Sequence, residues 1–238
     1  MADGGRPVVA VSGVTRGLGR ALLRRFAALG HPVAGCGRDT AALAGLAAEL
    51  GPTAHVLDRV DVTDAAAVEA WAERVRRELG APALVVANAG LAAGPAPLWE
   101  VPPDEFEAVL RVNVVGVYTM VRAFLPRLAD GGTLVNLSSG WGRTPRALLA
   151  TYTASKFAVE GLTRAVAEEA ARLRPGVRVV ALDPGGGIDT GMLATCMPET
   201  HQHYPTPEEW AENAADYLLH HLPAERDQIS LTVPQRTV

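Results

Sequence analysis

The stretch that most constrains the fold is an apolar run, residues 7–12, that leads through a glycine-rich turn into an amphipathic segment, residues 20–29. The run has the composition of a strand buried on both faces. The turn, Gly13-Val14-Thr15-Arg16-Gly17-Leu18-Gly19, follows the pattern G-x-x-x-G-x-G rather than the commoner G-x-G-x-x-G. A tight strand-to-helix turn needs one glycine, whereas three let a ligand approach the helix N-terminus, where a pyrophosphate is favoured. The turn therefore predicts nucleotide binding.

Strand-like and helix-like segments alternate along the rest of the chain. Short apolar runs predict further strands at residues 32–36, 55–60, 83–87, 132–137, 177–182 and 229–233. Longer stretches between them predict helices that end near residues 50, 79, 128, 173 and 221, and Asp104 is interpreted as the N-cap of the helix that ends near residue 128. No repeat, linker or low-complexity break interrupts the pattern, so residues 1–238 are expected to form one α/β domain. The expected architecture is a doubly wound, seven-stranded, mostly parallel sheet with helices on both faces.

The turn after the second predicted strand bears on which dinucleotide is bound. A site that prefers NAD carries an acidic residue there, about 20 residues past the glycine turn, to hold the ribose 2′-hydroxyl. Here Gly37 follows the strand and Arg38 comes next. A guanidinium suits a 2′-phosphate, and Arg16 supplies a second cation. Asp39 precedes a helix and is interpreted as its N-cap. An exposed loop arginine is the alternative for Arg38, but two arginines on converging loops favour NADP(H).

Polar residues follow the later strands, where ligands bind in an open parallel sheet. Asp61 comes earlier than a helix cap needs to be, so it is expected to face the adenine. Asn88 and Gly90 are expected to line the cleft, although Asn88 is equally well explained as a tie between strands. Asn113 lies amid apolar residues in mid-helix, which propensity explains poorly, so it needs buried partners, for which a bound water or a backbone carbonyl would serve. Ser139 ends the fifth strand, at the edge where sites lie.

Tyr152 and Lys156 lie four positions apart in the helical stretch 151–173, so they share one face of that helix. A lysine cation favours the phenolate and is expected to lower the tyrosine pKa from its usual value of about 10. Such a pair can move a proton to or from an alcohol oxygen. Taken alone, the pattern is more often a Tyr and a Lys on a solvated helix face.

The segment after the sixth strand is rich in glycine: Asp183-Pro184-Gly185-Gly186-Gly187-Ile188-Asp189-Thr190. The residues that follow, about 191–206, have a broken pattern and are expected to form a lid over a substrate pocket. His201 and His203 lie in this lid without a third ligand, so we expect loop or substrate contacts and no metal site.

The composition excludes several classes of partner. With 48% hydrophobic and 20% charged residues, the chain can bury a sizeable core. A net charge of −4 without a run of one sign predicts neither nucleic acid nor an anionic membrane as partner. Residues 1–7 are polar, and no apolar run is expected to reach the roughly 18 residues of a membrane span. Cys36 and Cys196 are far apart in the sequence and make no metal-type spacing, which suits a reducing compartment. Together these features lead us to expect a soluble cytoplasmic protein.

Several motifs follow one another in a specific order. They are Ser12-Gly13-Val14-Thr15-Arg16-Gly17-Leu18-Gly19, Asp61-Val62, Ala87-Asn88-Ala89-Gly90, Asn113, Ser139, Tyr152 with Lys156, and Pro184-Gly185. Each is weak alone, but the ordered set resembles the short-chain dehydrogenase/reductase family, in the branch of single Rossmann-like domains. The resemblance covers roughly residues 8–233.

The resemblance implies a role for each motif. Tyr152 would be the general acid in reduction and the general base in oxidation, and Lys156 would hold the nicotinamide ribose and lower the pKa of Tyr152. A fall from about 10 to near 7 is a change of about 4 kcal/mol, and the positive nicotinamide ring of the oxidised cofactor would add to the effect of the lysine. Ser139 would hydrogen-bond the substrate carbonyl, and Asn113 would hold a water in a proton relay to Lys156. The cofactor NADP(H) would be bound by Ser12, Gly13, Thr15, Arg16, Gly17, Leu18, Gly19, Arg38, Asp61, Val62, Asn88, Ala89, Gly90, Tyr152, Lys156, Pro184, Gly185, Ile188 and Thr190.

Two positions depart from the family pattern. Ser12 stands where threonine is usual, which keeps the hydroxyl. The loop from Pro184 to Thr190 holds one glycine more than usual, and this bears on the carboxamide contacts implied for Ile188 and Thr190.

The activity implied is an NADP(H)-dependent hydride transfer between the nicotinamide and a carbonyl or secondary alcohol, with ketone reduction favoured. The alternative is a catalytically silent NADP-binding regulator, but such proteins lose the Tyr, Lys or Ser that this chain retains. A lyase or epimerase would need a longer C-terminal part than the residues after Asp183 supply. We expect a medium-sized, largely apolar substrate that is surrounded by residues 91–97, 140–150 and 192–204. We also expect a homodimer or homotetramer built on the helices that carry Asn113 and Tyr152.

Overall fold

The computed structural model describes residues 6–223, 225 and 227–235, so the polar residues 1–5 lie outside the described part. Seven strands form one sheet in the order β3-β2-β1-β4-β5-β6-β7, and every described strand pair is parallel. The strands are β1 (Val9–Ser12), β2 (Val33–Gly37), β3 (His55–Arg59), β4 (Leu84–Ala87), β5 (Thr133–Leu137), β6 (Arg178–Asp183) and β7 (Ser230–Thr232). The order reverses beside β1, which makes the sheet doubly wound. The predicted fold class is confirmed.

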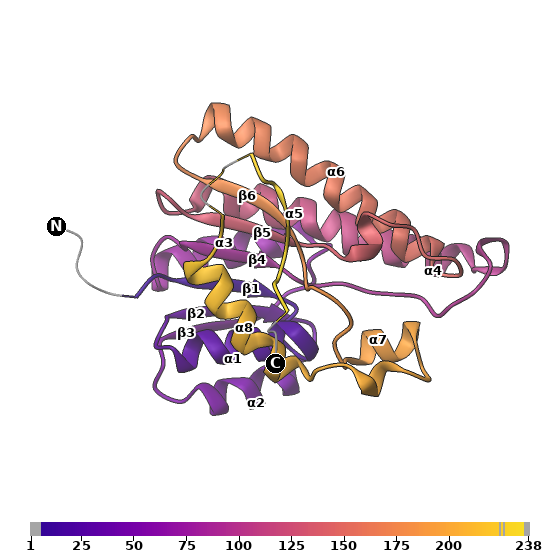
Figure 1. The fold of residues 1–238 in the computed structure, drawn as a ribbon. Helices are drawn as coiled ribbons and strands as arrows, with labels where there is room; N and C mark the ends of the chain where they lie inside the picture. The colour runs from indigo at the N-terminus through magenta and orange to yellow at the C-terminus, as the bar shows by residue number, and fades with distance from the viewer. Residues whose placement is uncertain (1–5, 224, 226, 236–238) are drawn as a thin grey trace.

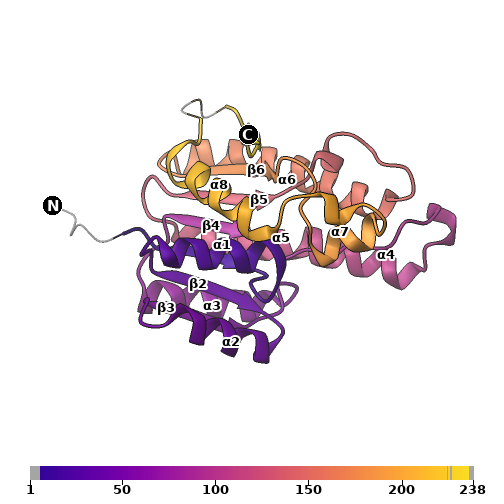
Figure 2. The same ribbon diagram turned by 60° about the horizontal axis from the view of Figure 1, so that its bottom comes forward.

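Helices cover both faces of the sheet (Figure 1). One face is covered by α1 (Gly17–Ala28), α2 (Thr40–Leu50) and α8 (Pro207–His220). The other is covered by α3 (Ala65–Glu78), α5 (Gly116–Phe124) and α6 (Ala150–Leu173). Two further helices, α4 (Pro103–Leu110) and α7 (Gly191–Cys196), extend beyond the sheet in both views (Figure 2).

The alternation of side chains along each strand divides the core in two. On β1, Val9 and Val11 pack towards α1, while Ala10 packs towards α3 and α5. All three side chains are fully buried, as expected for a strand of a parallel sheet covered on both faces. On the α3 side, the rings of Trp71 and Phe124 meet edge to face at 4.8 Å and fix α5 against α3.

Side-chain caps define several helix starts. Asp39 Oδ1 accepts a hydrogen bond from Ala42 N at 3.0 Å, which confirms Asp39 as the N-cap of α2. Asp64 caps α3 in the same way. The expectation that Asp104 caps the next helix is wrong, because α4 begins at Pro103 and Asp104 lies in its first turn. Proline suits this start, since it has no N–H to leave unpaired.

The helical stretch Pro103–Arg127 is long and apolar enough to cross a membrane by length and composition, contrary to the sequence expectation. In this fold α4 packs against α6, and α5 packs against α3, β4 and β5. The stretch is interrupted at Arg111–Val115 by a π-helix, η2, which holds the buried Asn113. Part of its apolar surface is therefore packed inside the domain, while Val115 and Tyr118 stay exposed.

Candidate active site

A cavity of about 540 Å³ opens where the strands end. It brings together most residues that the sequence singled out, from the turns after β1, β2, β3, β4, β5 and β6 and from α6. The predicted residues that line it are Gly13, Thr15, Arg16, Gly17, Leu18, Arg38, Asp61, Val62, Asn88, Ala89, Gly90, Ser139, Tyr152, Lys156, Pro184, Ile188 and Thr190. Four others, Ser12, Gly19, Asn113 and Gly185, are not among the residues that line it.

Ser12 and Asn88 join β1 to β4 at the point where the strand order reverses. Ser12 Oγ accepts hydrogen bonds from Asn88 N at 3.0 Å and Ala89 N at 3.1 Å. Asn88 Nδ2 donates to Ser12 O at 2.8 Å and to Gly13 O at 3.2 Å. Asn88 thus ties the strands and also lines the cavity, so both interpretations of it hold. Ser12 acts by holding the two turns together, and a cofactor contact for it stays a prediction.

The glycine turn and the start of α1 form one end of the cavity. Gly13 and Gly17 have φ of +73° and +57°, the left-handed region that glycine adopts without strain. A Cβ on Gly19 would lie 2.3 Å from Asn88 Nδ2, so only glycine lets α1 approach the turn. Within the described residues no side chain caps α1 at Arg16, which leaves first-turn N–H groups for a ligand. This end of the cavity therefore fits a pyrophosphate.

Arg38 stands at the rim of the cavity with a 68% exposed side chain. Its Nη1 lies 3.7 Å from Asp61 Oδ2, a long ion pair that is weak at such exposure. Asp61 Oδ1 accepts from both Thr63 N and Thr63 Oγ1 at 2.9 Å. Partial burial raises the pKa of Asp61, but these hydrogen bonds and the nearby Arg38 lower it by more. The net pKa lies below its usual value, so Asp61 is ionised. Asp39 is used as a cap, so Arg38 is the charged side chain that lines the cavity just after β2, and its contact with a 2′-phosphate stays a prediction.

Tyr152 and Lys156 are both buried on the face of α6 that meets the cavity. Lys156 Nζ donates a hydrogen bond to Leu137 O at 2.7 Å and lies 5.6 Å from the centroid of the Tyr152 ring. Burial lowers the pKa of Lys156 to about 8, although the Glu160 carboxylate opposes this. The helix face is therefore not a solvated one.

The expected fall in the pKa of Tyr152 is contradicted. Burial raises this pKa above its usual value, Cys196 and Asp183 raise it further, and only a hydrogen bond with Ser139 lowers it. The physical reason is that desolvation of the phenolate outweighs the lysine, whose ammonium lies over the ring face and bonds to a carbonyl. Tyr152 is consequently protonated at neutral pH.

Ser139 is placed beside Tyr152 by the short helix η4 (Gly140–Gly142), which it caps. Its Oγ accepts from Trp141 N at 3.2 Å and also hydrogen-bonds the Tyr152 hydroxyl. The Trp141 ring meets the Tyr152 ring edge to face at 6.0 Å and forms part of the cavity wall. Two hydroxyl groups thus converge on one point of the cavity, where a carbonyl oxygen can be held.

Asn113 is explained by its hydrogen bonds. Its Oδ1 accepts from Leu91 N at 2.7 Å, and its Nδ2 donates to Leu91 O and to Ser155 Oγ, both at 2.9 Å. The side chain therefore ties η2 to the loop after β4 and to α6, with a backbone carbonyl as one partner, as expected. Both amide hydrogens are used, and the water relay to Lys156 stays a prediction.

The glycine-rich loop after β6 is shaped by close contacts. Gly185 has φ of +91°, and a Cβ there would lie 2.2 Å from Val233 O. The last of the three successive glycines, Gly187, packs against the side chain of Tyr204, since a Cβ there would lie 2.6 Å from the Tyr204 ring. Ile188 and Thr190 still reach the cavity, but Thr190 Oγ1 accepts from Leu193 N and caps α7.

The segment from α7 to η5 (His201–His203) lies against this loop. His201 Nδ1 lies 2.6 Å from Asp189 Oδ1, and Asp189 N donates to Pro205 O at 2.8 Å. His201 therefore makes a loop contact, as expected. Met192, Tyr204 and other residues of the segment line the cavity, which is where a lid would stand.

Sequence reasoning missed some lining residues, of which Asp183 matters most. It ends β6, its Oδ1 accepts from Gly185 N at 3.1 Å, and it faces the cavity. The rule that selected Asp61 and Ser139, a polar residue at the carboxyl end of a strand, would also have found Asp183. Arg146 and Cys196 fall within the ranges expected to surround the substrate, but their charge and thiol were not singled out.

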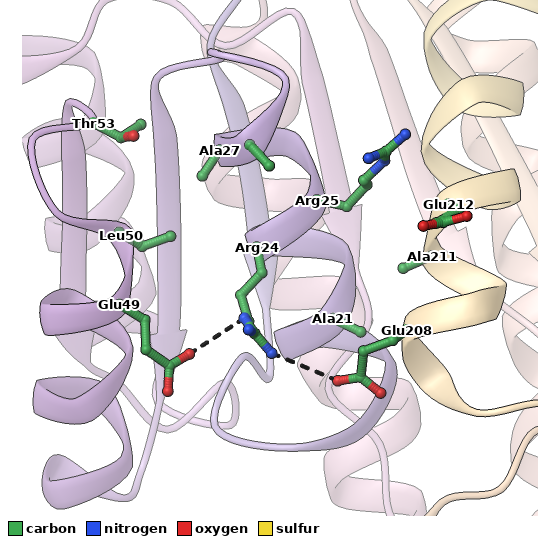
Figure 3. A pocket seen from close by; sticks show the side chains of 11 residues that line it. Ala21, Arg24, Arg25, Ala27, Glu49, Leu50, Thr53, Glu208, Ala211 and Glu212 are labelled. Atoms are coloured by element: carbon green, nitrogen blue, oxygen red, sulfur yellow. Dashed lines mark ion pairs between the residues drawn. The ribbon is translucent and has the colours of Figure 1, made fainter.

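A second hollow of about 350 Å³ lies between α1, α2 and α8 (Figure 3). There Arg24 pairs with Glu49 at 3.2 Å and with Glu208 at 3.7 Å, and Arg25 points towards α8 near Glu212. Among the described residues none of the predicted site positions lines it. We interpret it as an ion-paired seam that holds α8 against α1 and α2.

Comparison with known proteins gives consistent matches. The short chain dehydrogenase family matches residues 7–200. A protein of Arabidopsis thaliana named NADPH-dependent pterin aldehyde reductase is 42% identical over 228 residues, which cover 94% of this chain and 92% of the relative. A 3-ketoacyl-(acyl-carrier-protein) reductase from Brucella melitensis, complexed with NADH, has a TM-score of 0.84 at 29% identity and covers 96% of this chain and 97% of its own.

A short chain dehydrogenase from Shigella flexneri, complexed with NADP, has the same TM-score of 0.84 at 28% identity. The match covers 96% of this chain and 97% of that chain. Similar folds thus hold either dinucleotide, so the preference of this chain depends on its own residues.

Proposed function

This chain belongs to the short-chain dehydrogenase family of oxidoreductases, and from that premise we propose that it is an NADPH-dependent carbonyl reductase with Tyr152 as its proton donor. The observation that carries the proposal is the convergence of Ser139 and Tyr152 in the cavity that the glycine turn and Arg38 also enter.

The residues present fit NADP(H). The uncapped start of α1 and the glycines of the turn would hold the pyrophosphate, and Arg38, with Arg16, would hold the 2′-phosphate. Lys156 would hold the nicotinamide ribose. The name of the Arabidopsis relative supports the same cofactor.

Bound NADPH would supply the hydride for reduction of the carbonyl carbon. Ser139 Oγ would orient the carbonyl oxygen, and the Tyr152 hydroxyl would donate its proton to that oxygen as negative charge develops on it. The raised pKa of Tyr152 suits this direction, because the phenol is protonated at neutral pH and an alkoxide is a much stronger base than a phenolate. Lys156 has a pKa of about 8, so at neutral pH its side chain is a cation beside the Tyr152 ring.

For the substrate we propose a flat heteroaromatic aldehyde, such as a pterin aldehyde, in preference to the apolar ketone first expected. The Arabidopsis relative is named for that substrate, and this chain covers 92% of it. The walls near Tyr152 support the choice, since Trp141 and Tyr204 offer ring faces or edges, and Asp183 and Arg146 offer an acceptor and a donor.

The test is a steady-state assay of NADPH oxidation by its nicotinamide absorbance, with pterin and simple apolar aldehydes compared. Tyr152→Phe should lower kcat by a factor on the order of 10³ while leaving NADPH binding within about threefold, because only a hydroxyl is removed. Tyr217→Phe, on α8 away from the cavity, is the matched control. If Tyr152→Phe retained full turnover, the proposed mechanism would be wrong. If no aldehyde were turned over while NADPH bound, the silent regulator would be favoured.

Assembly and lid are also proposals. Val115 and Tyr118 around α5 and Phe157 on α6 are exposed apolar side chains on the helices expected to form the interface. We propose a homodimer or homotetramer through this face, which light scattering after size exclusion would detect. We also propose that the chain forms a single domain, in which residues 191–206 are a lid that opens and closes over the substrate.

A further inference from the structure

A buried carboxylate stands one helical turn beyond Lys156. Glu160 is on α6 and only 4% of its surface is exposed. Its Oε1 accepts from Arg143 Nε at 2.9 Å, and its Oε2 accepts from Ser230 Oγ at 2.6 Å. None of the sequence motifs includes Glu160, and the mechanism proposed above does not use it. A buried charge of this kind needs a reason, because desolvation makes it costly.

Arg143 joins Glu160 to the final strand. Its Nη1 donates to Thr232 Oγ1 at 2.9 Å and its Nη2 to Leu231 O at 2.6 Å. Arg143 follows η4, the short helix that Ser139 caps, and its own N donates to Gly140 O at 3.1 Å. The ion pair therefore connects the Ser139 loop, the helix of Tyr152 and Lys156, and β7.

The η4 loop packs directly on the backbone at Lys156. A Cβ on Gly142 would lie 2.9 Å from Lys156 O, so glycine is needed for this approach. The Lys156 ammonium is nearly wholly buried and is bonded to Leu137 O, a neutral acceptor. Its charge must be balanced by something other than water.

We propose that Glu160 is a positioning residue for the active site, whose carboxylate holds the buried Lys156 in its charged form and is itself held by Arg143 and Ser230. Glu160 acts through Lys156, and it touches neither substrate nor cofactor. The inference deepens the proposed function, since it assigns the charge state of the lysine that would hold the ribose.

Several other ionisable groups lie around Lys156. Tyr152 shares its helix, Asp183 at the end of β6, Cys196 on α7 and Arg146 after η4 face the same cavity, and Arg143 approaches from the η4 side. Burial raises the pKa of Cys196 to about 11, so the thiol is neutral near pH 8. Of the two carboxylates, Glu160 is the buried one and it raises the pKa of Lys156 against the effect of burial.

The sequence offers a direct measurement, because Lys156 is the only lysine among the 238 residues. Protein grown with isotope-labelled lysine gives one side-chain NMR signal, whose titration reports the pKa of Lys156 in the whole chain. The wild type should titrate near pH 8. Glu160→Gln should lower this pKa by about one unit, since it removes a nearby opposite charge and leaves Arg143 in place.

Three further variants separate charge from structure. Ser230→Ala keeps both charges and should leave the pKa of Lys156 unchanged even if it lowers stability. The double variant Arg143→Met with Glu160→Gln removes both charges and should give a pKa between those of Glu160→Gln and the wild type. Glu168→Gln, at an exposed position of the same helix, is the matched control.

Cofactor affinity gives a second readout. At pH 8, NADPH binding by Glu160→Gln, followed by fluorescence titration, should weaken about fivefold, because a one-unit shift leaves far less Lys156 charged. An unchanged Lys156 pKa in Glu160→Gln, or an equal shift in Ser230→Ala, would overturn the inference. Failure of the wild type to bind NADPH would overturn the proposed function and leave the NMR result standing on its own.

Discussion

Replacement of Lys156 by methionine is expected to stabilise the cofactor-free fold near neutral pH. Methionine has nearly the length of lysine and carries no charge to desolvate. The pKa of Lys156 falls from 10.5 to about 8 in the fold, a difference of about 2.5 units. At 1.36 kcal/mol per unit, holding this ammonium in the buried site costs about 3 kcal/mol below pH 8.

One loss offsets this gain. Lys156 Nζ donates to Leu137 O at 2.7 Å, and methionine leaves that buried carbonyl without this partner. Such a loss costs about 1 kcal/mol. The variant should therefore be about 2 kcal/mol more stable than the wild type at pH 7, while losing the lysine that the proposed function needs.

The sign of the pH dependence follows from linkage. Between pH 8 and 10.5 the unfolded chain still binds the lysine proton and the folded chain has released it, so the wild type gains stability as pH rises. Lys156→Met lacks this group, and its advantage should fall through that window and reach zero or reverse sign. The raised pKa values of Cys36 and Tyr152 act in both proteins and cancel in the difference.

The assay is urea unfolding of both cofactor-free proteins at pH 7 and at half-unit steps up to about pH 10, followed by circular dichroism. Leu162→Met, a half-buried position on α6, controls for methionine itself. A stability difference that stayed constant with pH would refute the reasoning that Lys156 is held charged against desolvation.

Three further predictions concern the cofactor, the core and the lid. Arg38→Asp should raise the ratio of the NADPH dissociation constant to the NADH dissociation constant by at least about tenfold, so that binding shifts towards NADH. An unchanged ratio would contradict the assignment of the 2′-phosphate contact to Arg38. Phe124→Ala should lower the free energy of unfolding by about 3–5 kcal/mol because it leaves a cavity beside Trp71, and a loss below about 1 kcal/mol would show that the site collapses. Asp189→Asn should weaken the contact with His201 and speed hydrogen exchange in α7 relative to α8, and equal rates would speak against this contact as the fastening of the lid.

The fold could be predicted because its signals are local. Most strands are short apolar runs, and several helix starts have their own chemistry, such as Asp39 before α2. The alternation of strands and helices indicates parallel crossovers and hence a parallel sheet, although it does not determine the order of the strands. Where prediction failed, as with Asp104, a proline had supplied the start of the helix instead.

The site was predicted less completely, because its remaining features depend on distant residues. Ser12 is used to tie β1 to β4 across 76 positions, which no local pattern shows. The pKa of Tyr152 rises because of burial, which a sequence does not show. Gly187 packs against the Tyr204 ring, and Glu160 pairs with Arg143 near β7. The sequence shows neither contact.

The central claim is that this chain transfers a hydride from NADPH to a carbonyl carbon. The direct measurement uses NADPH deuterated at the transferred position, a pterin aldehyde, and mass spectrometry of the alcohol formed. The account predicts one deuterium on the carbinol carbon with the wild type and almost no alcohol with Tyr152→Phe. Alcohol formed without deuterium, or no alcohol from any aldehyde while NADPH is bound, would contradict it.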